Sequence, residues 1–355
     1  MTRRNTTPPP IVVALITHTG GAHVSAYLDA LARADACSHV VLADSDGRWN
    51  ADARRVLGDK LTATYRDVGE MLSREKPALV LVTMEARRAP PVIDQALEAG
   101  CHVFAEKPSC VRAEDFAPLA RKADSKHRHL MLALANRLNP EVVKARELIA
   151  SGAIGKLYGL EMHLVADQTR LTRPSYHEQW FAHKERSGGG HLIWLGIHWL
   201  DLAMHITGTS IRRVAGFTAN VGGQPIDIED SAAAALQFDD GALGTITSGY
   251  YLDKGYHSHI KIWGAGGWLQ LQPREEIPLR WSSYTGEQAG TIQEFRGPDG
   301  PRGYAPFVAR AIEACAADAD PPIGARESLR ALRTVFAIYG AAKTGQAMEV
   351  AEDAG

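Results

Sequence analysis

The stretch CHVFAEKP, residues 101–108, predicts a short buried strand that ends at a Glu-Lys-Pro sequence. Its apolar run is too short for a helix, and it follows Gly100, a residue typical of helix ends. Pro108 cannot donate a ladder hydrogen bond, and it favours an extended backbone at Lys107. We therefore expect Glu106 and Lys107 at the carboxyl end of a parallel strand, where open α/β sheets bind ligands. The alternative for Lys107 is a solvated loop lysine.

The segments around this strand predict an α/β fold with a doubly wound parallel sheet. Apolar strands are expected at residues 11–16, 39–43, 78–83 and 130–135. Helices are expected between them, at residues 22–34, 51–57, 67–75, 91–99 and 114–126. Apolar strands that alternate with helices are typical of a parallel sheet covered on both faces. We expect this Rossmann-type, dinucleotide-binding domain to span residues 1–135.

A sheet of this kind offers a dinucleotide site. The loop after the first strand consists of Thr17, His18, Thr19, Gly20 and Gly21. A pyrophosphate is expected on the N-terminus of the following helix, and the two glycines provide a tight turn and a close backbone approach. The loop lacks Gly-x-Gly-x-x-Gly, because threonines occupy the first two glycine positions.

Asp44 ends the second strand. An acid at this position binds the adenosine ribose hydroxyls, and it favours NAD over NADP because it repels a 2′-phosphate. The alternative is that Asp44 is an ordinary turn residue at the end of a strand.

The second half of the chain predicts another α/β domain, residues 136–355, with a large, open, mostly antiparallel sheet. Long strands are expected at residues 156–166 and within 213–262, with glycine-rich turns between them. Asn139-Pro140 begins a helix, and residues 325–344 form another. Helices are expected to cover one face of this sheet.

The stretch SGGGHLIWLGIHWLDLAMHITG, residues 187–208, predicts a flexible glycine entry followed by a helix from about His191 to His205. His191, Trp194, His198 and Asp201 recur at helical spacing, so they share parts of one face. A histidine on such a face is commonly a core residue. The preceding glycines permit close approach of a ligand and favour a pocket role for His198. No carboxylate or cysteine completes a zinc site.

Composition excludes several classes of function. The 355 residues suggest two domains, and a net charge of −2 gives no basic field for nucleic acid or anionic lipid. No apolar run is long enough to span a bilayer, and MTRRNTTPPP at the N-terminus has no signal-peptide core. The four cysteines lack zinc-ligand spacing and favour buried thiols in a reducing cytoplasm.

With these motifs the chain resembles the Gfo/Idh/MocA family of NAD(P)-dependent oxidoreductases. The most specific marks are ALEAGCHVFAEKP, residues 96–108, and GGGHLIWLGIHWLDLA, residues 188–203. NRLNPEVVKARELIASGAIGKL at 136–157 and AIYGAAKTGQ at 337–346 agree. The resemblance implies a Rossmann domain, a C-terminal α/β domain that often forms oligomer contacts, and hydride transfer between a sugar or cyclitol carbon and nicotinamide.

The resemblance also implies roles for residues. Lys107 lies beside the reacting hydroxyl and the nicotinamide, and His198 acts as acid and base. Further cofactor contacts are expected at Thr83, Met84, Arg88, Glu106 and Asn136. The substrate pocket is expected to include Arg137, Trp180, His191 and Trp194.

The chain departs from the family pattern at three places. Trp194 replaces an Asp four residues before His198, which removes a carboxylate that orients the imidazole. The fingerprint glycines are replaced, as noted. Arg88 stands where the family has a His after the third strand.

Three functions remain open from the sequence. The first is an NAD-dependent dehydrogenase or reductase that acts on a sugar, cyclitol or glycoside. The second is a glycosidase or lyase that uses held NAD without net redox change, as the missing Asp would allow. The third is a nucleotide-binding relative without catalysis, as the altered phosphate loop would allow.

Overall fold

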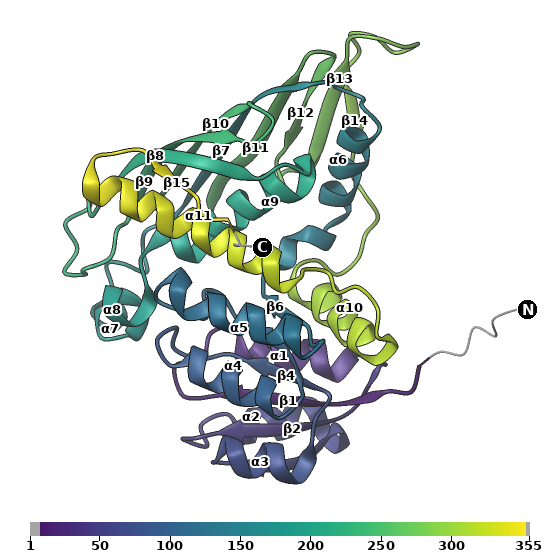
Figure 1. Cartoon of the computed structure of the whole chain (residues 1–355), viewed down its shortest axis with the longest axis vertical. Coiled ribbons are helices and arrows are strands. Elements are labelled where there is room, and N and C mark those ends of the chain that lie inside the picture. Colours follow the sequence, from purple (N-terminus) through teal and green to yellow (C-terminus); the bar gives the residue numbers. More distant parts are fainter. Residues whose placement is uncertain (1–7, 353–355) are drawn as a thin grey trace, which may run out of the picture. The chain divides into compact units, whose positions relative to one another are not determined.

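The computed structural model of the protein describes residues 8–352. Outside this range lie residues 1–7 and 353–355. The first of these ranges contains most of MTRRNTTPPP, for which we expected no signal peptide. The described chain divides into two compact units (Figure 1). The first contains residues 8–110, 114–135 and 301–329, and the second contains residues 111–113, 136–300 and 330–352. Residues 301–329, which we expected in the C-terminal domain, therefore pack in the first unit.

The first unit contains a six-stranded parallel sheet in the order β3-β2-β1-β4-β5-β6. This confirms the doubly wound fold. The chain changes its winding direction between β1 and β4, the point where such sheets bind ligands. The strands are β1 (Ile11–Thr17), β2 (Cys37–Asp44), β3 (Leu61–Tyr65), β4 (Leu79–Val82), β5 (His102–Ala105) and β6 (Leu130–Leu132).

Helices cover both faces of this sheet, which is why β4 and β5 are buried at every position (Figure 1). The helix α1 packs with α2 and α10, and α3 packs with α4. The helix α1 begins later than expected, because His23 adopts a left-handed backbone with φ 55°. The helices are α1 (Val24–Arg33), α2 (Asn50–Leu57), α3 (Val68–Glu75), α4 (Ala89–Glu98), α5 (Ala113–Ser125) and α10 (Tyr304–Ala317).

The helix α10 was not predicted. Among its buried residues, Phe307, Val308, Ala311 and Ile312 recur at helical spacing and are 0% exposed. Phe307 packs edge-on against Phe104 of β5, with ring centroids 5.8 Å apart. The apolar period was therefore available in the sequence, but the partner of this helix lies some two hundred residues earlier in the chain.

The second unit contains a nine-stranded sheet in the order β14-β13-β12-β11-β7-β10-β9-β8-β15. Its pairs are antiparallel except for β7 and β10, as the expectation of a mostly antiparallel sheet requires. The strands are β7 (Leu157–Asp167), β8 (Ile211–Ala219), β9 (Ser231–Phe238), β10 (Leu243–Leu252), β11 (Tyr256–Gly264), β12 (Gly267–Leu271), β13 (Leu279–Ser283), β14 (Gln293–Phe295) and β15 (Met348–Glu349).

Helices cover one face of this sheet (Figure 1). The helix α6 packs on β12 and on α9, which packs on β7. Alternate residues of β9 are exposed, and Phe217 of β8 is 78% exposed, so the other face is open. The helices and turns are η2 (Ala135–Leu138), α6 (Pro140–Ala150), α7 (Pro174–His177), η3 (Trp180–Ala182), α8 (Lys184–Ser187), η4 (Leu192–Gly196), α9 (Ile197–Thr207) and α11 (Ala325–Thr344).

The segment expected to be one regular helix from His191 begins instead with the π-turn η4 and becomes α-helical at Ile197. A π-turn adds one residue per turn, so side chains before and after it are rotated relative to the predicted face. Such turns are frequent at functional sites.

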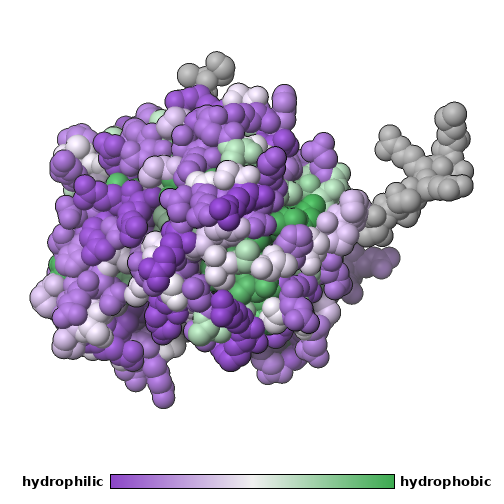
Figure 2. All heavy atoms as spheres, turned by 90° about the horizontal axis from the view of Figure 1, so that it is seen from below, coloured by the Kyte–Doolittle hydropathy of each residue, from purple (hydrophilic) through white to green (hydrophobic). Residues whose placement is uncertain are grey.

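The face drawn in Figure 2 is predominantly hydrophilic, with one limited hydrophobic patch. Among residues 8–352, no helix combines the length and the apolar character that membrane crossing demands.

Candidate active site

Glu106 and Lys107 follow β5 at its carboxyl end, where we expected them. The backbone N–H of Glu106 donates to the Val82 carbonyl of β4 at 2.8 Å, which continues the strand pairing by one residue. Both side chains are 3% exposed. Lys107 is therefore buried rather than a solvated loop lysine.

The Glu106 carboxylate is surrounded by aromatic side chains. Its Oε2 accepts a hydrogen bond from the Tyr27 hydroxyl and lies 3.3 Å from Nδ1 of His23. Tyr304 of α10 packs edge-on against Tyr27, with ring centroids 5.2 Å apart, and its hydroxyl is 3.1 Å from the same His23 nitrogen. Burial and the nearby Glu106 charge raise the pKa values of both tyrosines, so both remain protonated donors. Sequence reasoning missed Tyr27 and Tyr304 as partners of this carboxylate.

His18 links the predicted phosphate loop to the turn after β4. Its Nδ1 lies 3.1 Å from the backbone N–H of Gly20, and its Nε2 lies 2.9 Å from that of Glu85. Burial lowers the pKa of His18, and the neighbouring Arg88 charge lowers it further. A neutral imidazole accepts through one nitrogen only, so it satisfies one of these two N–H groups at a time.

Gly21 makes the close packing of this loop possible. A Cβ at this position would lie 2.2 Å from Oγ1 of Thr17 and 2.8 Å from the Thr83 carbonyl. The Thr83 hydroxyl donates to the Ala22 carbonyl at 2.5 Å. This glycine therefore provides the close approach of helix and strand that a dinucleotide fold needs at this position. The loop fits a dinucleotide, although threonines replace the usual glycines.

Asp44 and Asp46 have different partners. Both oxygens of the buried Asp44 carboxylate accept backbone N–H groups, from Asp46 at 3.2 Å and from Trp49 at 2.7 Å. This is the geometry of the turn-residue alternative. Oδ2 of the exposed Asp46 accepts the backbone N–H of Thr19 at 2.9 Å, a bond that lowers the pKa of Asp46. Asp46 is a carboxylate at the phosphate loop that the sequence analysis did not single out.

Three other expected cofactor residues differ in exposure. Met84 is buried just after β4, whereas Arg88 is exposed at the start of α4. Asn136 is half-buried in η2 of the second unit, where its amide oxygen lies 3.5 Å from Nδ2 of Asn139.

Arg137 forms a buried ion pair in the second unit. Its Nε donates to Oδ2 of Asp201 at 2.9 Å, and its Nη2 donates to Oδ1 at 2.6 Å. The two side chains are 2% and 3% exposed. We expected Arg137 to shape the substrate pocket, but its guanidinium instead joins η2 to α9.

Two of the three glycines before η4, Gly189 and Gly190, pack closely against other parts of the second unit. A Cβ at Gly190 would lie 1.8 Å from the Glu229 carbonyl, and one at Gly189 would lie 2.2 Å from the Tyr339 hydroxyl. The buried Glu229 carboxylate accepts the N–H groups of Gly190 and Leu192 at 2.7 and 3.0 Å, and the Tyr339 hydroxyl at 2.7 Å. This network fixes the start of the segment that carries His198.

The structure brings two of the predicted pocket residues together. The rings of Trp180 and Trp194 lie 5.2 Å apart, and Phe181 lies between 5.7 and 6.0 Å from both. Trp194, at the family's Asp position, is therefore part of an aromatic cluster.

His191 and His198 have different environments. His191 is fully buried, its Nδ1 lies 2.6 Å from the Ser248 hydroxyl, and its ring packs edge-on against Tyr250 at 4.4 Å. Burial lowers the pKa of His191 to about 3. His198 lies half-buried near the start of α9, one residue after Ile197. Only His198 therefore has the partial exposure that an acid–base residue needs.

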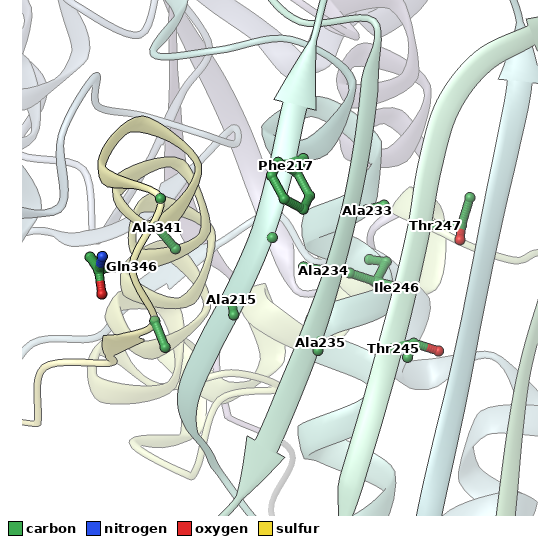
Figure 3. A pocket seen from close by; sticks show the side chains of 13 residues that line it. Ala215, Phe217, Ala233, Ala234, Ala235, Thr245, Ile246, Thr247, Ala341 and Gln346 are labelled. Carbon is green, nitrogen blue, oxygen red and sulfur yellow. The ribbon is translucent and has the colours of Figure 1, made fainter.

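A pocket of about 560 Å³ lies on the nine-stranded sheet, and none of the predicted site residues lines it (Figure 3). Its walls are small or apolar side chains of β8, β9 and β10, such as Phe217, Ala233 and Thr247, with Ala341 of α11 and Gln346 beside them. It contains no titratable group, so it offers no acid–base chemistry. Within the described range, no group of three or more His, Cys, Asp or Glu side chains is arranged to hold a metal ion.

Comparisons with known proteins agree with this architecture. A model described as "Oxidoreductase family, NAD-binding Rossmann fold" matches residues 19–134, and a model of the "GFO/IDH/MocA C-terminal domain" matches residues 142–270. The first unit is thus an NAD-binding Rossmann domain. The chain belongs to the GFO/IDH/MocA family of oxidoreductases.

The relatives include named sugar and cyclitol dehydrogenases. D-glucoside 3-dehydrogenase of Escherichia coli is 27% identical over 54% of this chain and 57% of its own length. Myo-inositol 2-dehydrogenase of Thermotoga maritima is 25% identical over 64% of this chain and 66% of its own. The chain thus matches between about half and two thirds of these curated relatives. The crystal structure of an oxidoreductase domain protein from Kribbella flavida superposes with a TM-score of 0.86, at 22% identity, over 97% of this chain and 100% of that one, which shows the fold.

Proposed function

We propose that this protein is an NAD-dependent dehydrogenase or reductase that acts on a hydroxyl or keto carbon of a sugar, cyclitol or glycoside. The observation that supports it most is the burial of Lys107 at the carboxyl end of β5, next to β4. The names of the two relatives above support the class of substrate. Bound NAD would supply the hydride acceptor.

In this proposal Lys107 donates a hydrogen bond to the reacting oxygen and stabilises the negative charge that develops on it. His198 removes the hydroxyl proton during oxidation and returns it during reduction. Trp194 has no carboxylate with which to orient His198, and its contact with Trp180 suits the apolar face of a sugar ring. Thr17, Gly20 and Gly21 would hold the pyrophosphate, with NAD preferred over NADP because of the acids that follow β2.

The test replaces Lys107 with Met, which keeps the length of the side chain and removes its charge. We expect turnover of a neutral sugar and cyclitol panel to fall by about 10²–10³-fold, as when one transition-state donor is removed. NADH binding, measured by fluorescence, should remain. Lys156→Met, a change at an exposed lysine, is the matched control. Undiminished turnover of the Lys107 variant would contradict the proposal.

Two other outcomes identify the other candidate functions. Sugar product without net change in NADH would indicate a glycosidase or lyase that oxidises its substrate transiently. Tight NADH binding without turnover of any sugar would indicate a binding protein. We further propose a homo-oligomer, which light scattering of the purified protein tests directly.

A further inference from the structure

Arg170 lies among three tyrosines in the second unit. It follows β7, and its guanidinium carbon lies 5.3 Å from the ring centroid of Tyr250. Its charge also interacts with Tyr256 and Tyr176. Tyr176 of α7 packs against the same apolar group as Tyr250 and Tyr256. We call these four residues, Arg170, Tyr176, Tyr250 and Tyr256, the Arg170 cluster.

The charge of the half-buried Arg170 has no carboxylate partner in the cluster. Among residues 8–352, no carboxylate oxygen lies within 4.0 Å of its guanidinium. The Asp167 carboxylate accepts the Thr169 N–H at 2.7 Å, which lowers the pKa of Asp167, and the Arg170 charge lowers this pKa further. Glu229 affects Tyr176 and Tyr250 electrostatically, but it already accepts three hydrogen bonds. A half-buried cation without an ion pair is costly unless a ligand neutralises it.

Further cations surround the same group. Arg173 also affects Asp167, and the guanidinium carbon of Arg274 lies 3.8 Å from the ring centroid of Tyr256. His191 contributes no charge near neutrality, because burial lowers its pKa to about 3. Arg274 therefore places a second cation beside Tyr256 of the Arg170 cluster.

The cluster is also rich in hydrogen-bond donors. A guanidinium can only donate, and each phenol offers an O–H donor, so Arg170 and the tyrosines beside it together present several donors. Burial raises the pKa of Tyr250 to about 12, so this phenol keeps its proton. Nε2 of His191, next to Tyr250, is buried and has no hydrogen-bond partner among the described residues. If Ser248 donates to Nδ1, this nitrogen carries a proton as well.

We propose that the Arg170 cluster binds an anionic group of the substrate, so that the preferred substrate is a sugar acid with a carboxylate rather than a neutral sugar. The inference rests on the proposed function, because it names the class of sugar. An arginine presents two parallel N–H groups to a carboxylate, and the phenols add neutral donors. Leu195, which packs against the buried group that contains Tyr250, precedes His198 by three residues on the same segment, so the anion site and the proposed acid–base residue belong to one unit.

The test compares two probes that differ only in charge, D-glucuronate and D-glucuronamide, with D-galacturonate and its amide as a second pair. For each we measure KM with NAD, and the affinity of the protein–NADH complex by thermal shift. Loss of a charged hydrogen bond weakens binding affinity by about 10- to 100-fold. We expect wild type to prefer the acid of one pair by that factor, and Arg170→Met to reduce the ratio to about one.

Arg173→Met is the matched control, because Arg173 is exposed in the same turn, and it should keep the acid-to-amide ratio. Should Arg170→Met fail to fold, Arg170→Lys and Tyr256→Phe replace it, and each should reduce the ratio in part. A general structural role would change both members of a pair equally. A wild type without preference for acids, or an Arg170 variant that keeps the preference, overturns the inference.

These outcomes separate the inference from the proposed function. Turnover of neutral sugars without a preference for acids leaves the dehydrogenase in place and removes the anion site. Arg170-dependent binding of glucuronate without turnover keeps the anion site and removes the dehydrogenase. Absence of both contradicts both.

Discussion

Asp44 and Asp46 stand two residues apart at the end of β2, and their carboxylates bind different partners. Asp44 accepts the N–H groups of its own turn, whereas Asp46 is exposed and bonded to Thr19 of the phosphate loop. The exposed Asp46 carboxylate can approach a 2′-phosphate at that loop, whereas both Asp44 oxygens are occupied by N–H groups of the turn.

We therefore expect Asp46→Asn to weaken the preference for NAD over NADP by about tenfold, the effect of one nearby charge. Asp44→Asn should instead lower thermal stability, because the amide keeps one acceptor oxygen and leaves one of the two N–H groups without an acceptor. Affinities for NADH and NADPH, measured by fluorescence titration, decide this. A larger loss of selectivity at Asp44 than at Asp46 would show that the buried acid is the selective one.

The buried pair Arg137 and Asp201 joins η2 to α9, and we expect it to stabilise the second unit. Replacing Arg137 with Leu leaves the buried Asp201 carboxylate unpaired, which should lower the free energy of unfolding by about 3–5 kcal/mol. Replacing both residues with Leu should cost less than either single change, because no buried charge remains. Urea denaturation of the three variants measures this. A loss below about 1 kcal/mol for the single variant, the range of an exposed ion pair, would contradict it.

Two buried histidines make stability depend on pH. Burial lowers the pKa of His191 to about 3 and that of His102 to about 4. The unfolded chain takes up protons at these positions below about pH 6.5, while the folded chain does not until its lower pKa is reached. Their contribution to the free energy of unfolding is therefore complete above about pH 6.5. It declines as the pH falls towards the folded-state pKa values.

We expect each histidine to contribute a slope approaching about 1.4 kcal/mol per pH unit between about pH 6 and pH 4. His102→Gln and His191→Gln should each flatten the pH dependence of the unfolding free energy relative to wild type. Urea denaturation across this range gives the slopes. A variant with the wild-type slope would show that its histidine titrates normally in the folded state.

At the scale of elements, the segment from Gly188 to His205 shows why a glycine run has more than one meaning. The sequence suggested ligand approach, but the glycines contact the Glu229 backbone and the Tyr339 hydroxyl. Whether such glycines admit a ligand or pack against protein depends on residues that lie tens of positions further along the chain. A single sequence does not show those contacts.

Substitution by Ala should rank these positions by the rigidity of the atom that each Cβ meets. Gly190→Ala meets backbone at 1.8 Å and should destabilise by about 3 kcal/mol or more, whereas Gly189→Ala meets the movable Tyr339 ring and should cost less. Gly324→Ala, whose nearest neighbour lies at 3.7 Å, is the control and should be tolerated. Thermal denaturation gives the order, and a tolerated Gly190→Ala would show that the entry is flexible after all.

Elements with a local signal could be predicted, and their distant partners could not. The strand before Glu106 and the position of Lys107 follow from an apolar run that ends at a proline. The pairing of Arg137 with Asp201 joins residues 64 positions apart, and no local pattern specifies it. The π-turn before Ile197 was also missed, because its backbone responds to packing rather than to a sequence period.

At the scale of the whole molecule, the first unit is completed by a segment from late in the chain. Residues 301–329 pack with it, and α10 contributes five residues that are 0% exposed. Tyr304 of that helix also lies next to Tyr27 and His23, beside Glu106. From the sequence we placed a single domain boundary after residue 135, because the simplest division of a chain is one in which each domain is one continuous segment.

A chain of residues 8–135 alone should therefore fail to form a stable NAD-binding domain. A version in which residues 301–329 are joined to it by a flexible linker should unfold cooperatively and bind NADH. Circular dichroism during heating and fluorescence titration test both. Cooperative unfolding of the shorter chain at the same temperature would show that α10 is dispensable.

The central claim is that this protein moves hydride between a sugar carbon and NAD, with Lys107 at the reacting oxygen. The most direct measurement follows deuterium from a substrate that is labelled at the reacting carbon, in wild type and in Lys107→Met. We predict that wild type transfers the label to C4 of NADH, and that the variant binds NAD but transfers label far more slowly. Wild type that releases unlabelled NADH, or a variant that transfers label at the wild-type rate, would contradict the claim.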